Sequence, residues 1–191
     1  VNEMEKGLAG ENSSLKMLPT YISIDDIPEK RSNVIVIDAG GTNLRIALVS
    51  FDYNTPSISY FKRYPMLGIK EPITKDEFFS TLAEYLVPLA GKSKKIGFCF
   101  SFPAEILPDR DGRAINLSKE VKITGIENSL IGKPLKNALE EKGFDIESIV
   151  IINDTVASLL GAKAVYGGRV HDSYIGFILG TGTNSCYIEN N

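Results

Sequence analysis

The stretch that decides the fold runs from Val34 to Arg45 and reads Val-Ile-Val-Ile-Asp-Ala-Gly-Gly-Thr-Asn-Leu-Arg. It opens with four consecutive β-branched apolar residues, a run that is typical of a strand buried on both faces. The glycine pair that follows predicts a tight turn, and Leu44–Phe51 predicts a second strand. The stretch therefore predicts two neighbouring strands joined by a short glycine-rich loop.

The segments that follow alternate between strand and helix patterns. Further strands are predicted at 57–64, 95–102, 149–152, 174–179 and 185–189, and helices at 74–90, 134–142 and 155–166. Thr74 and Glu77 have the spacing of a capping box, and Gly91 is expected to end the first of these helices. Three leading strands followed by strand–helix units predict an antiparallel meander and then right-handed crossovers. This α/β order is the ribonuclease-H-like topology, with a mixed five-stranded sheet.

Three parts are expected along the chain. Residues 1–31 form a polar leading segment with a weak helix signal, residues 32–172 the α/β domain, and residues 173–191 the first hairpin of a second, truncated copy. The chain begins with valine rather than methionine and stops just after a strand-like run. We therefore expect both ends to belong to something longer.

Composition excludes several classes of partner. The chain has 191 residues, of which 43% are hydrophobic and 24% charged, and its net charge is −3, so nothing indicates a nucleic-acid partner. No apolar run is long enough to predict a membrane partner, and no secretory signal is visible. Cys99 and Cys186 are far apart, and Cys99 lies in an apolar run that favours a buried thiol. These features predict a cytoplasmic protein, and nothing in them predicts an oligomeric state.

The loop after the first strand carries residues suited to phosphate chemistry. Asp38 follows the buried strand and is placed to hold Mg²⁺ through water. Adjacent glycines let backbone N–H groups approach a phosphate, and the polar neighbours add donors and a positive charge; the set is Gly40, Gly41, Thr42, Asn43 and Arg45. A plain hairpin turn explains the same residues equally well when the loop is taken alone.

Three further segments are weaker by themselves. Gly180–Asn184 is a second glycine-rich loop between strand patterns, for which a structural turn is the simpler reading. Asp154 emerges from a predicted strand at the start of a helix, which suits either a general base or a helix cap. Ile96–Pro103, with Ser118 and Lys119 further on, offers a hydroxyl and a lysine to a polyol, although an aromatic core strand and a solvated loop explain them more simply.

In combination these segments resemble the N-terminal part of eukaryotic-type hexokinases, which are actin-like ATPases. The resemblance covers nearly the whole chain in five motifs that follow one another in order. They are the leading segment with Gly7-Leu8 and Lys16–Thr20, the Asp38–Arg45 loop, Phe98–Pro103 with Ser118-Lys119, Asn153-Asp154-Thr155, and Ile178–Tyr187.

The resemblance implies a hexokinase that uses MgATP and a hexose such as glucose. It implies that Asp154 is the catalytic base and that the hexose is bound by Ser101, Phe102, Pro103, Ser118, Lys119, Asn153, Asp154 and Asn184. It also implies that ATP and its phosphates are bound by Asp38, Gly40, Gly41, Thr42, Asn43, Arg45, Thr181 and Gly182, with Asp38 holding Mg²⁺ through water.

Some residues depart from the family pattern. Leu117, Ser118 and Glu120 stand where the family commonly has tryptophan, threonine and glycine, which leaves the sugar preference open. The alternative to an enzyme is a non-catalytic sugar sensor on the same scaffold, which would not need to keep Asp154 as a base. A repressor-type bacterial glucokinase would carry a zinc-binding Cys/His cluster, whereas this chain has His171 and two distant cysteines. Because two sugar-binding glutamates and the adenosine pocket of the family lie beyond Asn191, we expect the 191-residue chain alone to be inactive.

Overall fold

A mixed five-stranded sheet forms the centre of the computed structural model, which describes residues 1–23, 32–52, 55–117, 120–166, 173–180 and 183–188. The strands are β1 (Asn33–Ala39), β2 (Asn43–Asp52), β3 (Thr55–Pro65), β5 (Lys95–Phe100) and β9 (Ser148–Ile152), in the order β3-β2-β1-β5-β9. β1, β2 and β3 pair antiparallel, whereas β1 pairs parallel with β5 and β5 with β9. The predicted meander followed by parallel crossovers is confirmed.

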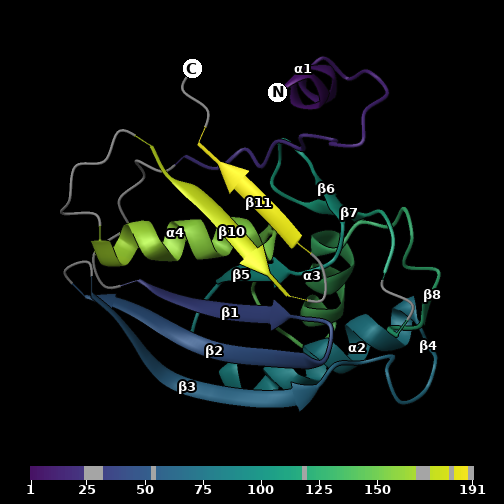
Figure 1. The fold of residues 1–191 in the computed structure, drawn as a ribbon. Coiled ribbons are helices and arrows are strands. Elements are labelled where there is room, and N and C mark those ends of the chain that lie inside the picture. The colour runs from purple at the N-terminus through teal and green to yellow at the C-terminus, as the bar shows by residue number, and fades with distance from the viewer. Residues whose placement is uncertain (24–31, 53–54, 118–119, 167–172, 181–182, 189–191) are drawn as a thin grey trace.

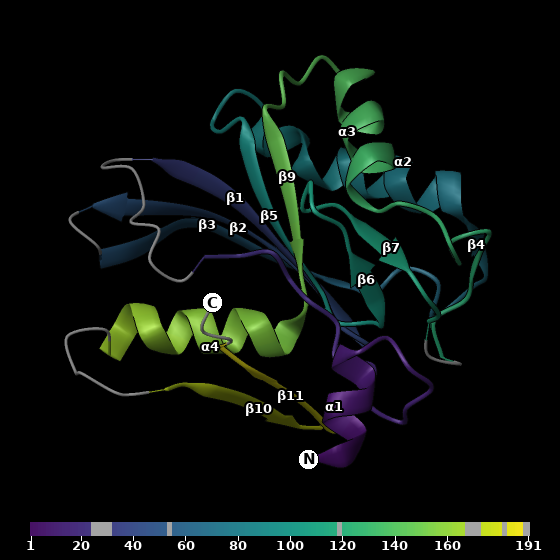
Figure 2. The same cartoon turned by 90° about the horizontal axis from the view of Figure 1, so that it is seen from above.

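Helices cover both faces of this sheet (Figures 1 and 2). α2 (Lys75–Leu86) and α3 (Gly132–Glu140) lie on one face, and α4 (Asp154–Tyr166) lies on the other. The hairpin of β10 (Ile175–Leu179) and β11 (Thr183–Tyr187) lies on the far side of α4, away from the sheet. None of the helices within the described ranges combines the length and apolar character that a membrane crossing requires.

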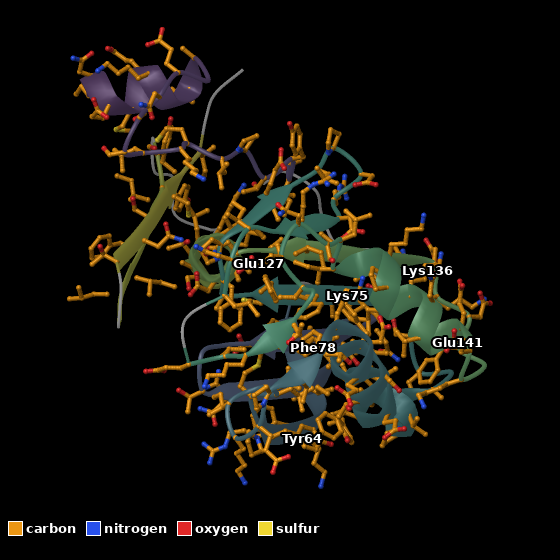
Figure 3. All side chains as sticks on the ribbon, turned by 90° about the vertical axis from the view of Figure 1, so that its right-hand side faces the viewer. Tyr64, Lys75, Phe78, Glu127, Lys136 and Glu141 are labelled. Atoms are coloured by element: carbon orange, nitrogen blue, oxygen red, sulfur yellow. The ribbon has the colours of Figure 1, made fainter. Side chains whose placement is uncertain are left out.

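The main core lies between the sheet and the α2–α3 layer. Ile35 and Ile37 of β1 are fully buried, and their partners across the sheet are apolar as well, namely Leu48, Ile46, Ile96 and Phe98. Phe78 of α2 is fully buried in the same layer (Figure 3). Each such side chain contributes about 1.5–3 kcal/mol on burial, so this layer fixes the register of the strands.

α2 begins as predicted but ends earlier. Thr74 accepts a hydrogen bond from the Glu77 amide at 3.2 Å, and the Glu77 carboxylate accepts one from the Thr74 amide at 2.7 Å, which completes the capping box. The helix ends at Leu86 rather than near Gly91, and η1 (Val87–Leu89) follows it. Pro88 explains the difference, because proline has no N–H and its ring obstructs the carbonyl four residues earlier.

Two pairs of very short strands were not predicted. β6 (Ala104–Ile106) pairs antiparallel with β7 (Gly112–Ala114), and β4 (Ile73–Thr74) pairs parallel with β8 (Ile123–Thr124). Strands of two or three residues are too short to produce a readable alternation in the sequence. They lie at the side of the domain where α2 and α3 are also found (Figure 1).

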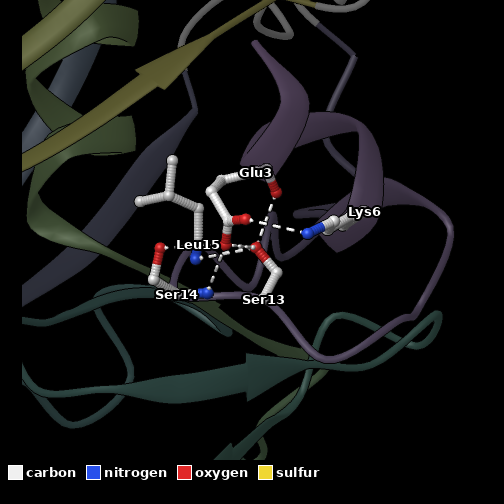
Figure 4. Close-up of polar contacts among 5 residues, drawn as sticks. All are labelled: Glu3, Lys6, Ser13, Ser14 and Leu15. Atoms are coloured by element: carbon white, nitrogen blue, oxygen red, sulfur yellow. Dashed lines mark hydrogen bonds and ion pairs between the residues drawn. The ribbon is translucent and has the colours of Figure 1, made fainter.

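The leading helix is shorter than its sequence signal. α1 spans Asn2–Leu8, and the chain then folds back so that a Cβ added at Gly7 would lie 2.0 Å from the Leu15 carbonyl oxygen. The Glu3 carboxylate holds this return by accepting hydrogen bonds from the Ser14 amide at 3.0 Å and the Ser13 hydroxyl at 3.1 Å (Figure 4). These bonds, chiefly that from the Ser14 amide, lower the pKa of Glu3.

A buried carboxylate fixes the start of α3. Asp111 is 9% exposed, and its side chain accepts hydrogen bonds from the amides of Gly112 at 2.6 Å, Gly132 at 2.6 Å and Lys133 at 2.9 Å. A Cβ at Gly132 would lie 2.9 Å from an Asp111 oxygen, so glycine is required for this close approach. Asp111 therefore caps a helix that begins 21 residues later in the chain.

We predict that Asp111→Ala lowers the free energy of unfolding by about 1–3 kcal/mol, because buried amide donors lose their acceptor. Urea unfolding should show a lower midpoint with an unchanged m-value. The matched control is Asp145→Ala, which removes an exposed carboxylate paired with Lys94 and should cost no more than about 1 kcal/mol. Equal effects of the two substitutions would contradict the assigned role of Asp111.

Candidate active site

The candidate site lies where three parallel-paired strands end. β1 pairs with β5 so that Asp38 is opposite Cys99, and β5 pairs with β9 so that Cys99 is opposite Ile152. The Ser101 amide extends the first pairing with a 3.1 Å hydrogen bond to the Ala39 carbonyl. The carboxyl ends of the three strands thus place three predicted site segments side by side at one edge of the sheet.

Asp38 and Arg45 form an ion pair across the first hairpin. The two residues are register partners on β1 and β2, and an Arg45 guanidinium nitrogen lies 2.5 Å from Asp38 Oδ2. Both side chains are partly exposed, at 31% for Asp38 and 43% for Arg45. The predicted magnesium residue and the predicted phosphate cation therefore lie in direct contact.

The glycine turn between these strands is open to its surroundings. Neither Gly40 nor Gly41 adopts a positive φ, and a Cβ added at Gly41 would meet no atom within 4 Å. The turn is fixed by a 3.0 Å bond from the Gly40 amide to the Asn43 carbonyl and a 2.9 Å bond from the Met66 amide to the Thr42 carbonyl. Among the described residues, the Gly41 and Thr42 amides donate to no backbone carbonyl. The turn therefore leaves two N–H groups without a backbone acceptor in the described part of the chain, next to unfilled space.

The aromatic strand end is divided between core and site. Phe102 is 4% exposed, and its ring packs against that of Phe100 with centroids 5.1 Å apart. Its side chain belongs to the core, which leaves only its main chain for a ligand. Ser101 is partly exposed at the site edge, and Pro103 is exposed. The predicted sugar residues Ser118 and Lys119 lie outside the described residues.

Cys99 lies between the two acidic residues of the site. Burial raises the pKa of the Cys99 thiol to about 12, and the negative charges of Asp38 and Asp154 raise it as well. A hydrogen bond with Ser101 acts in the opposite direction, with the sulfur and oxygen atoms 4.0 Å apart. The pKa of this one thiol is thus raised by the charges of both carboxylates, Asp38 of β1 and Asp154 of α4.

Asp154 occupies the first residue of α4, and Asn153 provides the cap of that helix. Asn153 Oδ1 accepts a hydrogen bond from the Thr155 amide at 3.1 Å, and the Asn153 carbonyl accepts one from the Ala157 amide at 2.9 Å. Asp154 Oδ1 also accepts from the Thr155 amide, at 2.8 Å. Among the described residues Asp154 Oδ2 accepts no hydrogen bond. Because Asn153 already caps the helix, Asp154 is not needed as the cap, and its Oδ2 is left to accept a hydrogen bond or a proton.

Asn184 of β11 joins this cluster from the hairpin. Its side-chain nitrogen donates to Asn153 Oδ1 and to Thr155 Oγ1, both at 2.8 Å. The Thr155 hydroxyl also donates to Asn153 Oδ1. Two residues predicted to bind the sugar are therefore in contact with each other. Thr181 and Gly182, predicted to bind phosphate, lie outside the described residues.

Sequence reasoning did not assign a site role to Cys99 or Thr155. The sequence predicts a buried thiol at Cys99 because its neighbours in sequence are apolar. Its position beside both carboxylates follows from the pairing of β1, β5 and β9, which one sequence segment does not reveal. Thr155 is 1% exposed, and the only available signal was its place next to Asp154.

Comparison with known proteins identifies the family. The family model described as Hexokinase matches residues 1–164, which is more than half of the chain. The chain belongs to the hexokinase family. The resemblance stated from its motifs is thereby confirmed, and the fold is that of the actin-like ATPases.

Individual hexokinases match along almost the whole chain. Human Hexokinase-3 is 31% identical over 196 residues, covering 97% of this chain, and a Brugia malayi hexokinase is 30% identical over 201 residues, covering 98%. The structure of a Schistosoma mansoni hexokinase complexed with glucose has a TM-score of 0.82, with 27% identity over 98% of this chain. The chain spans 20% of human Hexokinase-3, 34% of the Brugia protein and 44% of the Schistosoma chain.

The residues at the sheet edge suit a hydrated magnesium ion with a nucleotide phosphate. Asp38 supplies hard carboxylate oxygens, which Mg²⁺ prefers as direct or water-mediated ligands. It accepts a hydrogen bond from Arg45, and a carboxylate has about four lone-pair positions, so about three remain for water. The open turn at Gly41 provides the adjoining space.

We predict that the Cys99 thiol is poorly reactive in the folded chain. With a pKa of about 12, its thiolate fraction at pH 8 is roughly 10³-fold below that of an ordinary cysteine, partly offset by the higher nucleophilicity of such a thiolate. In a Cys186→Ser background, iodoacetamide should modify the folded chain at least about tenfold more slowly than the urea-unfolded chain. Equal rates would contradict the burial of this thiol.

The same raised pKa has a consequence for stability. The folded chain retains the Cys99 proton more tightly than the unfolded chain. The contribution of this thiol to the free energy of unfolding is therefore complete below the ordinary thiol pKa of about 8.5. That contribution is lost as the pH rises from about 8.5 toward 12. Relative to Cys99→Ser, the unsubstituted chain should therefore lose stability faster over this interval.

Proposed function

We propose that the protein carrying this chain is an ATP-dependent hexokinase, a phosphotransferase that moves the γ-phosphoryl group of ATP to the 6-hydroxyl of a hexose such as glucose. The observation that carries the proposal is the convergence of Asp38, Ser101 and Asp154 at one sheet edge beside an open glycine turn. Membership of the hexokinase family supports it. A cytoplasmic location is part of the same proposal.

In this proposal Asp154 accepts the proton of the sugar 6-hydroxyl. The hydroxyl oxygen forms a bond to the γ-phosphorus while the bond from that phosphorus to the bridging oxygen of ADP breaks. Asp154 suits the task because its Oδ1 is held by the Thr155 amide at 2.8 Å, while its Oδ2 accepts no hydrogen bond from the residues that the structure describes. The sugar hydroxyls would be held by Asn153 and Asn184, together with Ser101, Ser118, Lys119 and the main chain at Phe102 and Pro103.

The glycine turn and its neighbours take the nucleotide in this proposal. The phosphates would be bound by the amides of Gly41 and Thr42 together with Gly40, Asn43, Arg45, Thr181 and Gly182, and Asp38 would hold Mg²⁺ through water. MgATP, when bound, supplies the transferable phosphoryl group and part of the charge neutralisation. Arg45 is already held beside Asp38 by the 2.5 Å ion pair, which keeps its charge at the turn.

The domain division predicted from the sequence is also part of this proposal. Residues 1–31 would be a leading segment, 32–172 the first domain, and 173–191 the start of a second domain. In support, β10 and β11 pair only with each other among the described strands. The side chains of Ile175, Phe177 and Leu179 on β10 are 76%, 63% and 77% exposed, and an apolar strand face of this kind needs a covering layer.

We predict that Gly41→Val in the full-length protein weakens ATP binding and leaves hexose affinity nearly unchanged. The added side chain would occupy the open space that the phosphates need. Because a Cβ at Gly41 meets no atom of the chain within 4 Å, the variant should keep close to its normal melting temperature. Calorimetric titration with each ligand separates the effects, and unaltered ATP affinity would exclude the turn as the phosphate site.

We predict that Asp154→Asn in the full-length protein lowers kcat by at least the 10²–10⁴-fold typical of a lost general base. Hexose binding should stay within about tenfold, because the amide keeps Oδ1 as an acceptor for Thr155. A coupled assay for hexose 6-phosphate and calorimetry measure the two quantities. A variant retaining more than a tenth of the normal kcat would rule out Asp154 as the base.

The same measurements distinguish the enzyme from a sugar sensor. A full-length protein that binds glucose by calorimetry and yields no glucose 6-phosphate with MgATP would be a sensor. Turnover that is abolished by Asp154→Asn would establish the kinase.

A further inference from the structure

We propose that Thr155 is a positioning residue for the base Asp154, acting through its buried hydroxyl and its backbone amide. The inference rests on the proposed function and adds a residue to which no role has been assigned. Thr155 contacts no reacting atom in this scheme. Its effect passes through the three residues that it holds, which are Asn153, Asp154 and Asn184.

The first observation is the burial of a polar side chain beside the site. Thr155 is 1% exposed, and only Asp111 is a comparably buried polar or charged residue in the described part of the chain. A buried hydroxyl is costly unless it is hydrogen-bonded. The Thr155 hydroxyl is bonded twice, since it donates to Asn153 Oδ1 and accepts from Asn184 Nδ2.

The second observation is that the backbone of the same residue holds the base. The Thr155 amide donates to Asp154 Oδ1 at 2.8 Å and to Asn153 Oδ1 at 3.1 Å. One residue therefore holds the catalytic carboxylate with its amide and the two sugar-binding amides with its hydroxyl. A shift of Thr155 would move all three groups together.

The third observation is that these bonds join two elements. Asp154 and Thr155 begin α4, whereas Asn184 lies on β11 of the hairpin that packs against α4. The Asn184 side-chain nitrogen donates to the Asn153 and Thr155 side-chain oxygens, both at 2.8 Å. The hairpin that carries the second glycine-rich loop is thus fixed to the base through the Thr155 hydroxyl.

The test compares two substitutions of Thr155 in the full-length protein. Thr155→Val keeps the shape and removes the hydroxyl, whereas Thr155→Ser keeps the hydroxyl and removes the methyl group. The valine variant loses two hydrogen bonds, and each loss should lower kcat/KM by a factor of about 2 to 10. We expect kcat/KM for the hexose to fall by about 4-fold to 100-fold in Thr155→Val, with both kcat and KM affected and KM for ATP unchanged. Thr155→Ser should stay within about threefold of the unsubstituted protein.

A control separates positioning from loss of stability. Thr74→Val makes the same chemical change at another helix N-terminus, where the Thr74 hydroxyl accepts from the Glu77 amide at 3.2 Å. It should lower Tm without changing the kinetics, because α2 lies on the opposite face of the sheet from α4 (Figure 2). Equal kinetic losses in Thr155→Val and Thr155→Ser would indicate packing and overturn the proposal, as would kinetics of Thr155→Val within twofold of normal.

A second measurement depends on neither activity nor a substitution. The hydrogen-bonded side-chain NH₂ group of Asn184 should exchange with solvent more slowly than that of Asn137 on α3, although both residues are exposed. Equal exchange rates would show that the bonds to Thr155 and Asn153 do not persist in solution and would overturn the proposal. Should Asp154→Asn prove fully active, slow Asn184 exchange would still support the Thr155 contacts while the assignment of the base failed.

Discussion

The parallel pairing of β1, β5 and β9 is the constraint on which the site depends. Parallel strands bring their carboxyl ends to one edge, so residues 38, 99 and 152 to 154 become neighbours although they are far apart in sequence. The pairing is in turn fixed by the buried face, where Ile35 lies opposite Ile96 and Ile37 opposite Phe98. Slipping the register by one residue would expose these side chains and separate the two carboxylates.

Local patterns in the sequence were sufficient to predict the main elements. The apolar run before Asp38 predicts β1, and the Thr74–Glu77 spacing predicts the start of α2, because each depends on residues close in sequence. The Asp111 cap of α3 was not predictable in this way, since its donors lie 21 and 22 residues away. Nothing in the sequence around position 111 distinguishes this carboxylate from those of a surface turn.

The candidate site likewise has features that are local in sequence and features that depend on contacts between distant segments. The motifs predict which residues bear chemistry, and the family resemblance that they carry is confirmed. They do not reveal the contacts between motifs, such as the Asp38–Arg45 ion pair or the bond from Asn184 to Asn153. These contacts depend on sheet register and on the packing of the hairpin against α4, which are properties of the assembled fold.

Hairpin packing shows how a position outside the motifs determines site geometry. A Cβ added at Gly176 would lie 2.7 Å from Cys186 Sγ, 2.8 Å from the Thr155 carbonyl oxygen and 3.0 Å from Leu159 Cβ. Only glycine allows β10 to lie this close to α4. β11 is paired to β10, with Asn184 opposite Ile178, so this approach also sets the distance between Asn184 and Thr155. A side chain at Gly176 would push the hairpin outward and break the Asn184 bonds, although Gly176 lies outside every motif of the predicted site.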